Sequence, residues 1–163
     1  MFLTLLVNWP SGSRDDKIYR NMAVGADGFP AIRQSSSGLG ARIGEFGQLS
    51  SGLKDIHEVS PGVVTPFSGG MSANTDPIFG GVPWAGPFGF GDGTSKHPHW
   101  SLNPNILKSH NLQYVPDNDG STHGTVQPLG PISTKQYQKN LESTKHLWRN
   151  EGGGKGNSQE FKK

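Results

Sequence analysis

The chain has 163 residues, a length that fits a single domain with one core. Only 31% of the residues are hydrophobic, whereas 24 glycines and 12 prolines favour turns, so we expect a small core and long Gly/Pro-rich loops. The lack of cysteine excludes disulfides and thiolate metal sites, and a formal net charge of +2 is too small to indicate a general nucleic-acid binder.

Aromatic residues indicate that the chain folds. Four Trp, eight Phe and three Tyr are spread along the whole sequence, and such side chains supply the burial that disordered chains lack. We therefore expect one folded domain over residues 1–150. Residues 151–163, which are glycine-rich and basic, are predicted to form a disordered tail.

The first half of the chain contains few periodic segments. The apolar run 1–7 has no basic n-region and is too short for a signal peptide or a membrane span, so it predicts a buried strand. A second short strand is predicted over 17–20, and the small residues of 35–41 predict a loop. Alternation over 55–64, interrupted by a Pro-Gly pair, predicts two short strands or one bent strand.

The second half opens with a long loop and then becomes more regular. Residues 77–98 are rich in Gly, Pro, Trp and Phe without a polar/apolar period, and a loop of that length in a small domain is usually functional. A short helix is expected around 103–109, and strands are expected at 112–115 and 123–127.

A helix is predicted to begin near Ser133. Ser133 and Gln136 have capping-box spacing, while Ile132 and Tyr137 are placed to form a hydrophobic staple. A glycine triplet at 152–154 is expected to stop the helix. Four residues recur at helical spacing and would form one core-facing stripe: Tyr137, Leu141, Thr144 and Trp148. These elements predict an α+β fold with a small split sheet and a C-terminal helix.

Three segments carry groups suited to a ligand. Gly69 and Gly70 would let the backbone approach a ligand closely, and the Ser72 hydroxyl can hydrogen-bond a ribose or an amide. His123 begins a late strand, and Arg20 ends an early one, where a guanidinium can bind a phosphate through two hydrogen bonds. Each has a structural alternative: a turn for the glycines, a buried histidine, and a solvated surface arginine.

In this order the segments resemble the small ADP-ribosyltransferase-fold cytotoxins exported by type VI secretion systems, over roughly residues 17–149. In that family a Gly-Gly pair is followed by Thr-Ser, and a histidine on a late strand is also needed for toxicity; by position these match Ser72 and His123. Met71 stands where the family has threonine, which removes one hydroxyl. The resemblance implies an NAD-dependent toxin in which Arg20 holds the pyrophosphate, Ser72 positions the nicotinamide ribose, and His123 orients the second ribose or the attacked bond.

The late catalytic glutamate of the arginine-serine-glutamate transferases is missing. Gln127 stands at that place and is neutral, so it cannot stabilise an oxocarbenium-like transition state by charge or act as a general base. The nearest carboxylates in the sequence are Asp117, Asp119 and Glu142. This departure favours a first alternative, a protein of the same fold that transfers a phosphate from RNA or binds a nucleotide. A second alternative is a non-catalytic, loop-rich interaction module.

The resemblance also implies a set of residues that contact NAD. They are Arg20, Gly69, Gly70, Met71, Ser72, Trp100 and Gln127. Trp100 belongs to an aromatic group that either forms a wall for a base or nicotinamide ring or covers a thin core. No metal site is expected from His97, His99 and His110, because Pro98 fixes an extended geometry and no carboxylate stands at ligand spacing.

The resemblance also implies a protein partner and a cellular location. A toxin held in its producer's cytoplasm, before delivery to the cytoplasm of a target cell, needs a neutralising immunity protein. Occlusion of the active site is the simplest way for that protein to act. No membrane partner is expected, since no apolar segment is long enough to span a bilayer.

Overall fold

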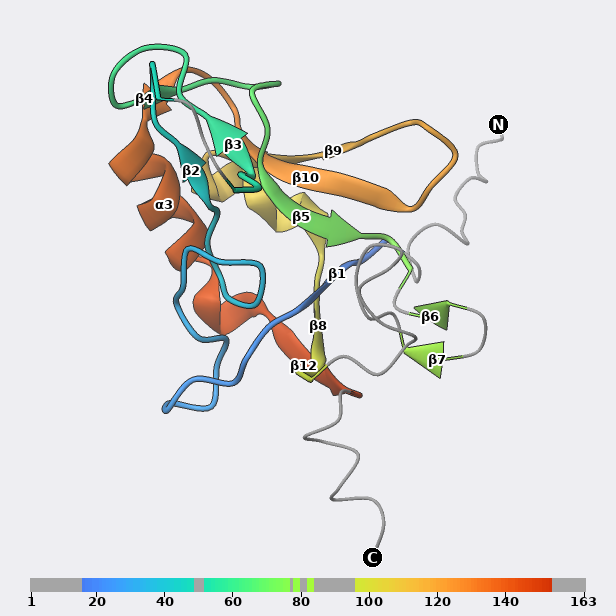
Figure 1. The fold of residues 1–163 in the computed structure, drawn as a ribbon. Helices are drawn as coiled ribbons and strands as arrows, with labels where there is room; N and C mark the ends of the chain where they lie inside the picture. Colours follow the sequence, from blue (N-terminus) through green and yellow to red (C-terminus); the bar gives the residue numbers. More distant parts are fainter. Residues whose placement is uncertain (1–15, 49–51, 77, 80–81, 84–95, 154–163) are drawn as a thin grey trace, which may run out of the picture.

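A six-stranded antiparallel sheet forms the centre of the computed structural model, which describes residues 16–48, 52–76, 78–79, 82–83 and 96–153. The strands lie in the order β12-β8-β1-β5-β10-β9 (Figure 1). Their bounds are β1 Ile18–Asn21, β5 Met71–Asn74, β8 His99–Leu102, β9 Leu112–Pro116, β10 His123–Pro128 and β12 Arg149–Gly152. The predicted strands over 17–20, 112–115 and 123–127 are confirmed as β1, β9 and β10.

Short strand pairs and helical turns surround this sheet. The pairs are β2 Ile43–Gly44 with β3 Ile56–His57, β4 Val63–Val64 with β11 Ile132–Ser133, and β6 Ile78–Phe79 with β7 Val82–Pro83. The helical segments are the 3-10 helices η1 Pro104–His110 and η2 Lys145–Leu147 and the α-helix α3 Thr134–Glu142. The predicted α+β fold with a split antiparallel sheet and a C-terminal helix is therefore confirmed.

The two faces of the six-stranded sheet differ in chemistry. One face carries Ile18, Met71, Trp100 and Val126, which are all fully or almost fully buried and pack in one core with Tyr137 and Leu141 of α3. The opposite face, here called the polar face, carries the alternate residues of the same strands, because successive side chains point to opposite sides. Its residues are Tyr19, Asn21, Ser72, Asn74, His99, Ser101, His123, Thr125 and Gln127.

The C-terminal helix begins where the sequence predicts but is shorter. The Ser133 hydroxyl accepts a hydrogen bond from the Gln136 backbone N–H at 3.0 Å, which confirms the N-cap. The helix ends at Glu142, because the next two hydroxyls bond back to its last carbonyls: Ser143 to Asn140 at 2.6 Å and Thr144 to Leu141 at 2.7 Å.

The chain after the helix corrects two further expectations. All four residues of the predicted stripe are buried, yet Trp148 follows the turn η2 rather than lying in the helix, with its indole Nε1 donating to Thr144 Oγ1 at 3.0 Å. The chain then enters β12, which pairs with β8 as far as Gly152. The predicted domain boundary at residue 150 thus falls inside a strand of the main sheet.

Some sequence predictions fall on residues that the structure does not describe. They are the strand over 1–7, most of the loop over 77–98, and the tail beyond residue 153. Within the described ranges, no helix has the length and apolar character needed to cross a membrane.

Candidate functional site

Ser72 and His123 lie on the polar face, on neighbouring strands. The register pairs Ser72 of β5 with Thr125 of β10, and it pairs Asn74 with His123. Ser72 and His123 are therefore diagonal neighbours on the same side of the sheet, a relation that brings side chains within reach of one small ligand. Both side chains are partly exposed, whereas their strand neighbours Met71 and Gly124 are buried.

His123 is held by a carboxylate. Its Nδ1 lies 2.6 Å from Oδ2 of Asp117, the residue that follows β9, and both side chains are about one third exposed. The Asp117 backbone N–H donates to the His123 carbonyl at 2.9 Å, so the pair is fixed through main chain and side chain together. Because the contact uses Nδ1, it leaves Nε2 as the ring nitrogen that can exchange a proton with a ligand. This is the orienter and base arrangement of many general-base catalysts.

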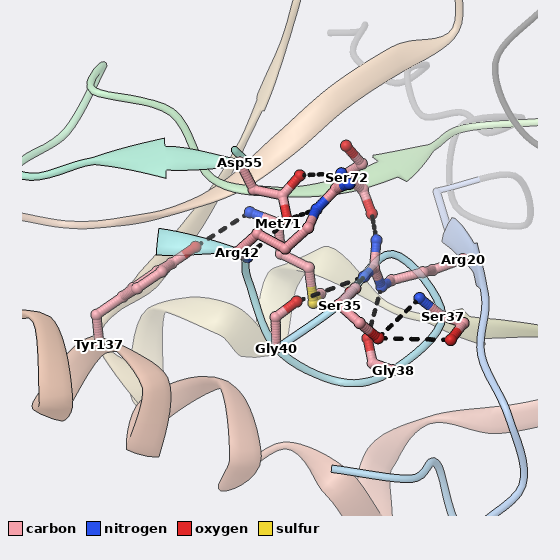
Figure 2. Close-up of polar contacts among 10 residues, drawn as sticks. All are labelled: Arg20, Ser35, Ser37, Gly38, Gly40, Arg42, Asp55, Met71, Ser72 and Tyr137. Atoms are coloured by element: carbon pink, nitrogen blue, oxygen red, sulfur yellow. Dashed lines mark hydrogen bonds and ion pairs between the residues drawn. The ribbon is translucent and has the colours of Figure 1, made fainter. Parts of the chain in front are cut away.

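Arg20 does not belong to this site. The structure places it on the core side of β1, 5% exposed, with its guanidinium bonded to main-chain carbonyls (Figure 2). Nε donates to Gly38 at 3.0 Å, Nη1 to Ser72 at 2.8 Å, and Nη2 to Ser35 at 2.8 Å and Gly40 at 3.4 Å. The prediction that Arg20 holds a pyrophosphate is therefore wrong for this structure, since its donors are used inside the protein.

Arg20 links β1 to β5 beside the point where these strands pair. The register of β1 and β5 has the single pair Tyr19 and Asn74, and two residues before Asn74 the Ser72 carbonyl accepts a hydrogen bond from the Arg20 guanidinium. Burial lowers the pKa of Arg20 to about 10, an effect that the nearby Asp55 carboxylate partly opposes, so the group remains a cation at neutral pH. Arg20 thus positions Ser72 from behind and ties β5 to the loop over 35–40.

The two glycines before β5 also serve the fold. A Cβ at Gly69, whose φ is +117°, would lie 2.3 Å from the Asp55 carbonyl oxygen, and a Cβ at Gly70 would lie 2.4 Å from that of Val126. The Gly70 N–H donates to the Asp55 carbonyl at 2.8 Å. The sequence interpretation, in which these glycines let a ligand approach the backbone, is therefore corrected. Their missing side chains make room for the neighbouring backbone of Asp55 and Val126.

Met71 and Trp100 are core residues. Met71 is fully buried, and Trp100 is 1% exposed with its Nε1 donating to the Met22 carbonyl at 2.9 Å. Both lie on the face opposite to Ser72, so neither contacts a ligand on the polar face. Their predicted role in cofactor binding is wrong, and for Trp100 the alternative of core cover is the correct one.

Gln127 is on the polar face, but its amide is engaged. Its Oε1 accepts from the Phe67 backbone N–H at 2.9 Å, and its Nε2 donates to Thr125 Oγ1 at 2.9 Å. Gln127 is 5% exposed. It therefore orients Thr125 and fixes the turn at Phe67, where φ is +69°, rather than offering free donors to a cofactor.

Three residues of the polar face were given no role on it by the sequence analysis: Asn21 and Asn74, which were not considered, and His99, which was considered only as a metal ligand. They lie on adjacent strands, since β1 pairs with both β5 and β8 and Asn21 stands opposite His99. Burial lowers the pKa of His99, although the Glu151 carboxylate and the Gly152 backbone oppose the change, so its ring is neutral at neutral pH. The sequence signal that could have found them is the polar residue at every second position of a strand. This alternation identifies the polar side of one strand, but it does not show which strands lie next to each other in the sheet.

Comparison with known proteins adds no family. The sequence matches no protein-family model and has no significant similarity to a curated protein. The candidate site therefore rests on its geometry and on the resemblance of its motifs.

Proposed function

We propose that the chain is an NAD-dependent toxin of the ADP-ribosyltransferase type, with its active site on the polar face around Ser72 and His123. The observation that supports this most directly is the β5–β10 register, because it brings onto one side the two residues that the resemblance implicates. Arg20, Met71 and Trp100 are not part of the proposed site.

The residues of the polar face suit a nucleotide substrate in two respects. The hydroxyls of Ser72 and Thr125 stand opposite each other, and hydroxyls that both donate and accept suit the hydroxyls of a ribose. Next to them, Asp117 holds His123 at 2.6 Å in the orientation of a general base.

The His123–Asp117 pair takes the part of the missing late glutamate. His123 Nε2 accepts the proton of the attacking water or acceptor hydroxyl, while the bond between the nicotinamide nitrogen and ribose C1′ breaks and nicotinamide leaves with the electron pair. Asp117 stabilises the imidazolium that forms and places a negative charge near the cationic ribose. Glu142 is not needed for this scheme.

The proposal is tested by NAD turnover. We expect the purified chain to bind NAD in a calorimetric titration and to release nicotinamide. His123→Ala should lower the rate by about 100- to 10,000-fold, the usual contribution of a general base. Ser72→Ala should lower it as well, with the melting temperature of both variants unchanged.

His146→Ala is the matched control, because His146 is exposed on η2 and contacts Phe29 instead of the polar face. It should keep full activity. Absence of both NAD binding and nicotinamide release in the wild-type chain would refute the proposal. If activity in a recipient cell survives Ser72→Ala and His123→Ala, a non-catalytic interaction module is the correct function.

A second candidate uses the same residues on RNA. The specific observation in its favour is that Gln127 supplies no carboxylate and is bound within the fold, whereas the His123–Asp117 pair is suited to deprotonating a ribose 2′-hydroxyl. Incubation with labelled NAD and labelled RNA in separate reactions distinguishes the two, since only one label should be converted.

The partner expected of such a toxin is an immunity protein that covers the polar face. Co-expression of a candidate from the neighbouring reading frame should restore growth of cells that express this chain. Binding of that protein should be weakened by substitutions at Thr125 and His123, which lie on the proposed surface.

A further inference from the structure

Three buried polar atoms on the polar face have no hydrogen-bond partner within the described part of the chain. They are Asn21 Oδ1, Asn74 Nδ2 and His99 Nδ1. Asn74 is 3% exposed and His99 is 8% exposed. Since a buried unpaired polar atom costs about 1–3 kcal/mol and such atoms are rare in native folds, three on one face point to a ligand group that satisfies them.

The three residues form one cluster next to the proposed catalytic residues. Asn21 of β1 stands directly opposite His99 of β8, and Asn74 lies on the other side of β1, opposite Tyr19. Asn74 is also the residue opposite His123 on β10. The cluster and the His123–Asp117 pair are therefore continuous across the sheet.

Hydrogen bonds within the chain decide which atom of each amide is free. Asn21 uses its Nδ2 to donate to the His97 carbonyl at 2.9 Å, which leaves Oδ1 as an acceptor. Asn74 uses its Oδ1 to accept from Thr122 Oγ1 at 2.9 Å, which leaves Nδ2 as a donor. His99 Nδ1 serves as either, depending on the tautomer. The cluster thus presents one fixed acceptor and one fixed donor.

We infer that Asn21, Asn74 and His99 bind a planar ligand edge that carries a donor beside an acceptor; on the proposed function, this edge is the carboxamide of nicotinamide. The ligand amine would donate to Asn21 Oδ1, and its carbonyl would accept from Asn74 Nδ2. The adenine edge of NAD has the same chemistry, with an amino group beside a ring nitrogen. Because the three atoms are closed to solvent, hydrogen bonds to them are shielded from competing water.

The test measures binding of small ligands to the full chain by NMR titration. Nicotinamide is compared with 3-acetylpyridine, which keeps the carbonyl but has a methyl group in place of the amine. We expect the wild-type chain to prefer nicotinamide by at least about tenfold, because 3-acetylpyridine leaves Asn21 Oδ1 unpaired. Asn21→Ala should bring the preference close to one, since the variant has no acceptor to satisfy.

Asn140→Ala is the matched control. Asn140 is a buried asparagine with an unpaired Nδ2, but it lies on α3, so its substitution should keep the full preference. Asn74→Ala provides a second test if Asn21→Ala does not fold, because it should weaken nicotinamide and 3-acetylpyridine alike by removing the donor to their carbonyl. Equal affinity of the wild-type chain for the two ligands, or a preference that survives Asn21→Ala, would overturn the inference.

A parallel titration identifies the source of the edge. Adenosine is compared with purine riboside, which has no amino group. If the preference for adenosine depends on Asn21 and the preference for nicotinamide over 3-acetylpyridine does not, then the edge belongs to adenine and the nicotinamide assignment is overturned. Failure of the inference is distinct from failure of the proposed function. NAD turnover that needs Ser72 and His123 without any Asn21-dependent preference refutes only the inference, whereas the preference without NAD turnover refutes only the function.

Discussion

Replacement of Arg20 by lysine separates a structural role from a ligand-binding role. Lysine keeps the positive charge but concentrates it on one nitrogen with three donors, whereas the guanidinium spreads five donors over a planar fork. The three shortest contacts of Arg20 use three different nitrogens, to Gly38, Ser72 and Ser35. A single ammonium cannot lie within hydrogen-bond distance of all three carbonyls.

The stability lost in Arg20→Lys follows from the carbonyls that would be left without a hydrogen-bond donor. Two buried carbonyls losing their donor, at about 1–3 kcal/mol each, give a loss of about 2–6 kcal/mol in the free energy of unfolding. For a domain of this size, each kcal/mol corresponds to about 2–4 °C, so we expect the melting temperature to fall by about 4–24 °C. Urea unfolding and thermal melts measure the two quantities.

The control is Arg33→Lys, because Arg33 is exposed and, among the described residues, its guanidinium has one hydrogen bond, to Ser37 Oγ at 3.4 Å. Its free energy of unfolding should change by less than about 0.5 kcal/mol. The opposite pattern for Arg20→Lys, an unchanged melting temperature with a large loss of NAD affinity, would refute the structural role and restore the role in binding pyrophosphate.

Three further changes test how the rest of the fold supports the site. Tyr137→Phe should lower the free energy of unfolding by about 1–3 kcal/mol, measured by urea denaturation, because the hydroxyl donates to the Val126 carbonyl at 2.6 Å and accepts from the Met71 N–H at 3.1 Å; an unchanged value would show that these groups pair with each other instead. Trp148→Ala should lower the free energy of unfolding by about 3–5 kcal/mol in the same assay, because this side chain is 3% exposed and packs in the core. A loss of less than about 1 kcal/mol would contradict that packing. The pKa of Glu58 is lowered from 4.5 by hydrogen bonds from Thr134, Phe46 and Gly62, so its stabilisation is present above pH 4.5 and is lost as the pH falls through the lowered value. Glu58→Gln should therefore flatten the acid limb of a stability curve, and an identical limb would contradict the assignment.

Local patterns predicted the elements whose causes are local. The capping hydroxyl of Ser133 and the alternation of β1, β9 and β10 involve residues that are neighbours in the sequence, and these elements occur as expected. The length of the helix was overestimated, because helical spacing cannot show that Ser143 and Thr144 will bond back and end it.

Long-range contacts explain the errors at the site. Arg20 was interpreted as a phosphate ligand because a strand-ending arginine gives no sign of carbonyls that lie far away in the chain, such as that of Ser72. Gly69 and Gly70 show the same limit, since a missing side chain makes room for protein backbone as readily as for a ligand. Of the three residues that the resemblance gives catalytic roles, Ser72 and His123 share a face, whereas Arg20 lies on the other side of the sheet.

The most direct test of the proposed function is nicotinamide release from NAD by the wild-type chain and by His123→Ala, with melting temperatures measured on the same samples. We predict release by the wild-type chain, a fall of at least about 100-fold in the variant, and equal melting temperatures. No release by the wild-type chain, or equal release by both, would contradict the placement of an NAD-cleaving site on the polar face.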